Sequence, residues 1–169
     1  MICRTRTPAR TSLVAGAALL ALGLTAPVAA ADFEATLAPT DGSGVPEGHA
    51  TEDWLAAEGT ATAVADGDEH EVTLEAAGLV PDGLYTFWWV TPGIVTTAMG
   101  PGGGVPGNDF RADEDGAADV TIRVPADNDY AMMVVAYHAD DQTHGDSPGE
   151  MGAVTFQHLE GPWPGPAND

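Results

Sequence analysis

The sequence predicts an all-β domain built as an antiparallel β-sandwich, and three observations support this fold class. Apolar and polar residues alternate with a period of two in several short segments, which is typical of strands with one buried face. Turn signals, among them Asp66-Gly67 and Asp115-Gly116, separate these segments. Four Trp and four Phe residues supply large apolar side chains for a core.

About seven segments carry the strand pattern: 32–38, 59–65, 70–76, 83–91, 117–124, 130–138 and 151–159. The second and third are joined by the Asp66-Gly67 turn, which predicts a hairpin. One short helix is expected at 51–58, because acidic residues occupy its first turn and Gly59 follows it. Two packed antiparallel sheets are the economical arrangement for these strands, so the predicted architecture is Ig-like.

Two of the predicted strands are apolar on both faces. In 83–91 the two sides carry Tyr85, Phe87 and Trp89 against Thr86, Trp88 and Val90. The strand 130–138 ("YAMMVVAYH") has the same character. We expect both strands to be central, with their outer faces covered by a loop, a helix or another subunit. The long Gly-rich loop 92–110 is the candidate within this chain, and loops of this length are usually functional or mobile.

The first 31 residues predict a cleaved signal peptide. Three arginines precede the apolar run 12–24, and small residues before Asp32 form a cleavage motif. The run is too short to span a bilayer comfortably, so we expect a secreted protein with no transmembrane segment in its mature chain. The mature chain is then one domain over 32–160, followed by a flexible Pro-rich tail over 161–169.

The mature chain is strongly acidic. Only Arg111 and Arg123 oppose 26 acidic residues, and there is no lysine. Repulsion among these acidic side chains destabilises the folded chain in dilute buffer, but salt screens it, because the Debye length falls to about 3 Å at 1 M. The composition therefore predicts a halophilic, salt-adapted protein. The charge excludes nucleic acid and anionic membrane surfaces as partners. The partner classes left are a protein and a small ligand, and the sequence does not identify either one.

The only cysteine, Cys3, lies in the predicted signal peptide. The mature chain therefore has neither disulfides nor thiolate ligands, which excludes a blue-copper centre. A Gly-x-Ser-x-Gly elbow and a phosphate-binding loop with a lysine are also absent from the sequence. We therefore expect a protein that is not an enzyme.

A metal site is predicted at His138, His144 and Asp141. His138 ends an apolar strand, and the loop after it carries the second histidine among several acidic residues. Imidazole and carboxylate ligands together suit zinc or copper(II). We expect such a site to lie where the histidines meet the loop 92–110. The alternative is that His138 packs at the strand end and His144 bonds loop carbonyls.

Calcium is a further cofactor candidate. Two turns gather carboxylates, the ligands that Ca²⁺ prefers. These carboxylates are Asp113, Asp115 and Asp119 in one turn and Asp66, Asp68 and Glu69 in the other. Neither turn follows the twelve-residue EF-hand pattern, and an ordinary hairpin turn is the alternative explanation.

A ligand surface is the last candidate, formed by Trp88, Trp89 and Tyr137. Aromatic side chains on strands with two apolar faces can stack on a sugar or on a protein partner. The alternative is that they belong to the core, where aromatic residues at such positions are more often found.

Short motifs add two resemblances. "GLVPDGLYTFWWV" resembles the turn and strand of copper–zinc superoxide dismutases and of chordin-type sandwich domains. This resemblance implies a sandwich but not dismutase activity, because Phe87, Trp88 and Trp89 occupy the strand in which the dismutases carry metal histidines. "YTFWWV" and "YHADDQTHG" resemble a group of exported prokaryotic β-sandwich domain proteins of uncharacterised function, which implies a common sandwich and no activity.

Taken together, these features predict a secreted, salt-adapted β-sandwich module with a non-catalytic, binding or envelope-associated role. The alternative is an exported metal-binding protein that uses His138 and His144. A hydrolase is a third class, for which the sequence identifies no catalytic residues.

Overall fold

The computed structural model describes residues 32–91, 93 and 97–165. The predicted signal peptide, part of the Gly-rich loop and the last four residues of the predicted tail lie outside the described residues. Among the residues described, no helix has the length and apolar character needed to cross a membrane.

The all-β prediction is confirmed, with 49% of residues in strands and 3% in helix. The strands are β1 (Phe33–Pro39), β2 (Glu58–Asp66), β3 (Glu69–Ala77), β4 (Leu84–Thr91), β5 (Ala98–Pro101), β6 (Asp109–Arg111), β7 (Ala118–Pro125), β8 (Met132–His138) and β9 (Thr155–Pro162). One short helix, α1 (Thr51–Trp54), lies between β1 and β2.

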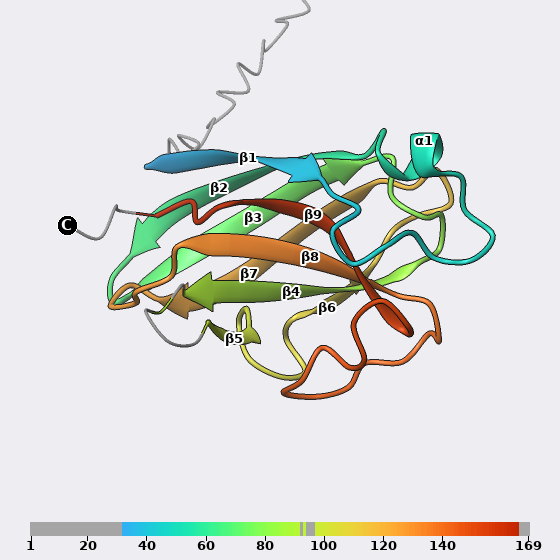
Figure 1. Ribbon diagram of the computed structural model, residues 1–169. Helices are drawn as coiled ribbons and strands as arrows, with labels where there is room; N and C mark the ends of the chain where they lie inside the picture. Colours follow the sequence, from blue (N-terminus) through green and yellow to red (C-terminus); the bar gives the residue numbers. More distant parts are fainter. Residues whose placement is uncertain (1–31, 92, 94–96, 166–169) are drawn as a thin grey trace, which may run out of the picture.

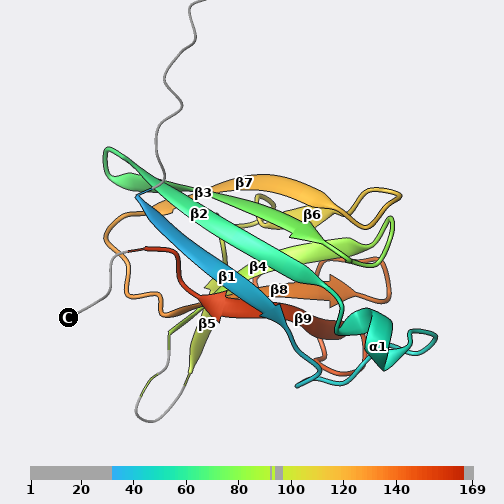
Figure 2. The same ribbon diagram turned by 90° about the horizontal axis from the view of Figure 1, so that it is seen from above.

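The strands form one antiparallel sheet that curls on itself as a half-barrel (Figures 1 and 2). Its order is β5-β4-β8-β9-β1-β2-β3-β7, with β6 also paired to β4. The finer prediction of an Ig-like sandwich is not confirmed, because β1 pairs along its length with β2 and, at Ala38 and Pro39, with β9. Strand β1 thus joins the two halves of the sheet.

All seven predicted strands are present, with shifted ends. The predicted hairpin joins β2 to β3, with Asp66 opposite Glu69 and Gly67 at φ 69°. The last strand begins at Thr155, four residues later than predicted, and ends at Pro162. Trp163 after it is buried. The domain therefore extends past the predicted boundary at residue 160, because these residues pair with β8 and pack on the core.

Two further predictions need correction. The helix covers Thr51–Trp54 rather than 51–58, because Glu58 and Gly59 already pair with Ala77 and Ala76 in the sheet. The described part of the loop 92–110 contains β5 and β6, which pair with the edge of β4. A central strand needs hydrogen-bond partners for its backbone along both edges, and these two short strands supply them on one side.

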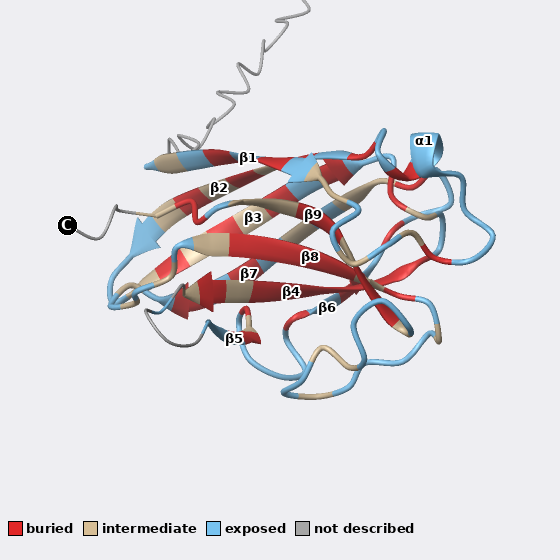
Figure 3. Cartoon of the chain, viewed as in Figure 1, coloured by how far each residue is buried: buried red, intermediate tan, exposed pale blue. Residues whose placement is uncertain are grey.

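The main core lies inside the curl of the sheet, and β4 and β8 are buried on both faces, as predicted (Figure 3). Tyr85 and Phe87 of β4 face the main core. On the other face, Trp88 and Val90 pack with Val134 and Ala136 of β8 in a smaller cluster. Burial on both faces fixes the position of β8, and therefore of His138 at its end.

Candidate metal centre

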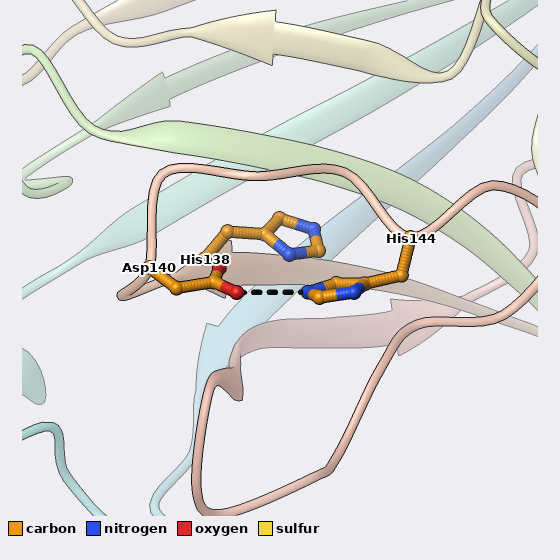
Figure 4. A group of neighbouring side chains, drawn as sticks. All are labelled: His138, Asp140 and His144. Carbon is orange, nitrogen blue, oxygen red and sulfur yellow. Dashed lines mark ion pairs between the residues drawn. The ribbon is translucent and has the colours of Figure 1, made fainter.

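The candidate centre lies where β8 ends and the chain leaves the sheet. His138 is the last residue of β8 and lies opposite Thr155, the first residue of β9. The connection between them, residues 139–154, folds back over the end of the sheet and carries His144 (Figure 4). One ligand candidate is therefore held by a central strand, and the others come from a loop.

Three side chains converge here: His138, Asp140 and His144 each offer one ligand atom, and these atoms lie within 4.8 Å of one another. Asp140 Oδ2 lies 3.2 Å from His144 Nε2, and the two imidazole centroids are 5.7 Å apart. The side chains of His144 and Asp140 are 29% and 23% exposed, whereas His138 is buried. The centre thus has a buried base and a side open to solvent.

The structure does not bring Asp141, the carboxylate predicted from sequence, into this group. Asp141 has a positive φ of 58°, and its side chain forms an ion pair with Arg111 Nη2 at 2.6 Å. Its neighbour Asp140 lies beside His144 instead. The predicted ligand is thus off by one residue, because the left-handed backbone at Asp141 turns the two adjacent carboxylates in different directions.

The ring of His144 packs closely on the backbone of Gly149. A Cβ atom at Gly149 would lie 2.6 Å from His144 Cδ2, and the φ of Gly149 is 88°, a conformation that residues with a side chain rarely adopt. Glycine at this position therefore allows the imidazole ring of His144 to pack against the loop backbone, while Asp140 Oδ2 contacts its Nε2 atom.

The hydrogen bonds of His138 determine which ring nitrogen carries the proton. The Thr155 hydroxyl donates to the Pro148 carbonyl at 2.5 Å, and its single hydrogen is used there. The contact between Thr155 Oγ1 and His138 Nδ1, at 3.3 Å, must therefore be donated by an N–H of the ring. His138 is thus protonated on Nδ1.

The other nitrogen of His138 accepts a hydrogen bond from β4. Trp88 Nε1–H donates to Thr86 Oγ1 at 2.7 Å, and Thr86 Oγ1 lies 2.7 Å from His138 Nε2. In the neutral ring Nε2 has a lone pair, so the Thr86 hydroxyl donates to it. Burial lowers the pKa of His138, the positive charge of His144 lowers it further and Asp140 opposes the shift, so the neutral form is favoured.

In the part of the chain that the structure describes, the two calcium candidates serve other purposes. Asp113 Oδ1 accepts the backbone N–H groups of Asp115 and Ala117, which closes the turn. Asp66 and Glu69 lie 2.8 Å and 3.6 Å from Arg123 Nη1 in an ion-pair cluster. Neither set brings three carboxylates together as a metal site would require.

Trp88, Trp89 and Tyr137, the predicted ligand surface, do not form one exposed surface. Trp88 is 1% exposed and belongs to the smaller apolar cluster. Trp89 is half-buried and stacks on Tyr130, with the ring centroids 4.6 Å apart. Tyr137 is half-buried and packs against Tyr85 on the main-core face. These aromatic residues therefore pack within the fold, which was the alternative explanation.

Sequence reasoning missed two features near this end of the sheet. Asp140 is one of the acidic residues around the predicted site, but the prediction assigns the ligand role to its neighbour Asp141. His158 lies in the predicted strand 151–159, to which the sequence assigns no site; in the structure it is buried in β9 and hydrogen-bonds Tyr85 and the backbone of Trp54. No local signal indicates this role, because alternation with the apolar Leu159 would place His158 on the opposite face, and the bulge at His158 changes that direction.

A groove of about 680 Å³ lies away from the histidines. It crosses the sheet at Thr36, Thr60 and Glu75 and is otherwise lined largely by carboxylates and alanines, with Arg111 at one side.

The predicted contact between the histidines and the loop 92–110 is not observed among the described residues, where the partners of His138 come from β4, β9 and the loop 139–154.

The chain was compared with protein-family models and with curated protein sequences, and it matches neither a family model nor a curated sequence.

Proposed function

We propose that this protein is a non-catalytic, exported module that binds a divalent transition-metal ion, zinc or copper(II), at His138, Asp140 and His144. The observation that carries the proposal is the convergence of two imidazoles and one carboxylate, with ligand atoms within 4.8 Å of one another. Two nitrogen ligands and one oxygen ligand suit both ions, and copper(II) is expected to bind the more tightly.

The surroundings of the three side chains support this proposal. His138 is fixed by β8, while His144 and Asp140 lie on a loop and can close by the small distance that coordination requires. In Figure 4 the ring nitrogen next to Cγ of His138, which is Nδ1, faces the other two ligands. Metal binding there displaces the 3.3 Å contact with Thr155 and moves the ring proton to Nε2. Thr86 Oγ1 then accepts from both His138 and Trp88, and its own hydrogen has to turn to another acceptor.

The N-terminal sequence and the charge support an extracytoplasmic setting. The arginines and apolar run of residues 1–31 have the form of a signal peptide. Outside the cell a site without thiolates avoids oxidation, and the acidic surface draws cations toward it.

Calorimetric titration of the metal-free protein with Zn²⁺ and with Cu²⁺ tests the proposal. One ion per chain should bind to the wild type. His144→Ala should weaken binding by more than the roughly 10- to 100-fold that loss of an outer-shell partner costs. His49→Ala, which removes an exposed histidine elsewhere, should leave binding unchanged.

The adjacent aspartates provide a matched pair of variants. Asp140→Asn removes a proposed ligand, whereas Asp141→Asn removes the same charge from the neighbouring residue. Asp140→Asn should weaken metal binding much more than Asp141→Asn. Equal effects of the two substitutions, or unchanged binding in His144→Ala, would rule out this site.

A further inference from the structure

The connection between β1 and β2, residues 40–57, contacts β9 at two places: Thr40 and Ser43 bond the backbone of His158 and Gln157, and Trp54 packs on the buried ring of His158. We call this connection the cap segment. The pairing of β8 with β9 shifts register between Val135 and Ala136, and His158 is the extra residue of this bulge. Bulges redirect side chains. The ring of His158, only 1% exposed, stacks on the indole of Trp54 in the cap segment, with centroids 3.6 Å apart and planes 11° apart.

The hydrogen bonds of His158 run in one direction and require a neutral ring. The Trp54 carbonyl can only accept, so His158 Nε2 carries a hydrogen and donates to it at 2.9 Å. Nδ1 then has a lone pair and accepts from the Tyr85 hydroxyl at 3.0 Å. The Tyr85 oxygen in turn accepts from the Val80 N–H at 2.8 Å. The chain of bonds thus links the β3–β4 loop, β4, β9 and the cap segment.

A second proton on His158 breaks this arrangement. Nδ1–H would then face the Tyr85 oxygen, which would accept two N–H donors while its own hydrogen loses its acceptor. Burial raises the pKa of Tyr85, so its hydroxyl does not ionise to accommodate the change. The other titratable groups on this side are Tyr137 of β8 and two cap-segment residues, His49 and Asp53.

The titration of His158 agrees with this geometry. Burial lowers the pKa of His158 to about 4. The bond to the Trp54 carbonyl opposes the shift, and the positive charge of His49 adds to it. The ring is therefore neutral at neutral pH, with every ring nitrogen paired.

We propose that His158 is an acid-sensitive latch: when its ring takes up a second proton, the part of the cap segment around Trp54 detaches from β9 and the pocket beneath it opens. This pocket has a volume of about 220 Å³ and lies between two walls, with His158 beside them. The cap segment forms one wall with His49, Asp53 and Trp54, and residues 78–81 form the other. The Trp54 indole N–H bonds the Thr40 carbonyl within the cap segment, so the indole moves with that segment.

Hydrogen exchange followed by mass spectrometry tests the latch, with the full chain at pH 3 to 7 in 2 M KCl, a concentration at which charge repulsion is screened over about 3 Å or less. Exchange should be corrected for its intrinsic pH dependence. Peptides from residues 40–57 should lose protection as the pH falls through about 4, while peptides from β2 and β3 remain protected. His158→Gln, which cannot titrate, should show no such transition.

Tyr85→Phe provides a second variant should the glutamine variant fail to fold. It removes the hydroxyl that stabilises the neutral ring, so the opening should move to higher pH. Tyr130→Phe, at a half-buried tyrosine that stacks on Trp89 instead, should leave the midpoint unchanged. The latch is refuted if the cap segment opens only together with β2 and β3, if its protection is constant, or if His158→Gln or Tyr85→Phe opens at the wild-type midpoint.

Discussion

The buried histidine of β9 should make the stability of the fold depend on pH, and replacing it should remove that dependence. The pKa of His158 is lowered from 6.5 to about 4 in the folded protein. Because the folded value is the lower one, the unfolded chain takes up the proton first as the pH falls below 6.5. The contribution of His158 is therefore complete above pH 6.5, is lost progressively between pH 6.5 and 4, and changes no further below pH 4.

The magnitude follows from the size of the shift. One pKa unit corresponds to about 1.4 kcal/mol, so the difference between folded and unfolded values amounts to about 3 kcal/mol. Urea denaturation of the wild type and of His158→Gln, at several pH values in constant salt, measures it. The carboxylates titrate in both proteins, so the quantity to compare is the difference in unfolding free energy between them. That difference should fall by about 3 kcal/mol from pH 7 to pH 4. A difference that stays constant with pH would refute the reasoning.

Three other outcomes follow from the structure. Gly149→Ala should weaken metal binding, because the added Cβ would lie 2.6 Å from His144 Cδ2 and displace that ring; calorimetric titration measures the effect. Thr86→Val should lower the unfolding free energy by about 2–6 kcal/mol, because it leaves a buried indole N–H and a buried imidazole nitrogen without partners; urea denaturation measures the loss. The melting temperature should be higher in about 2 M KCl than in dilute buffer, because salt screens repulsion among the 26 acidic residues.

Matched controls separate these effects from general damage. Gly145→Ala imposes the same kind of positive-φ strain, at φ 68°, where a Cβ meets nothing within 4 Å, so it should leave metal affinity unchanged. Equal losses in both glycine variants would contradict the packing argument for Gly149. Thr73→Val removes one hydroxyl of an exposed hydrogen-bonded pair, Thr73 and Thr121, and should lower the unfolding free energy far less than Thr86→Val. Equal melting temperatures with and without salt would contradict the argument from charge.

Much of the fold could be predicted from local patterns. Alternation identified the seven long strands, and the two strands with apolar residues on both faces proved to be central. The short strands β5 and β6 escaped prediction, because they have little alternation of their own and form by pairing with β4. The closure of the sheet through β1 escaped it too, because pairing between Pro39 and Leu159 is a long-range contact with no local signal.

The candidate site was predictable in residue type and less so in residue identity. The fixed position of His138 followed from the apolar strand before it, and His144 does lie near it. The choice between Asp140 and Asp141 depended on one left-handed residue and on an ion pair with Arg111, neither of which a single sequence specifies. The role of His158 depended on a bulge in β9 and on the cap segment folding over it, which are both tertiary features.

X-ray absorption spectroscopy of the zinc-loaded or copper-loaded protein tests the proposed metal centre most directly. The proposed site predicts two imidazole nitrogens and one carboxylate oxygen at about 2.0–2.2 Å from a zinc ion. His144→Ala should reduce the imidazole count by one, and Asp141→Asn should leave the spectrum unchanged. A spectrum with a single imidazole or none, or one that His144→Ala does not alter, would contradict a metal centre built on His138, Asp140 and His144.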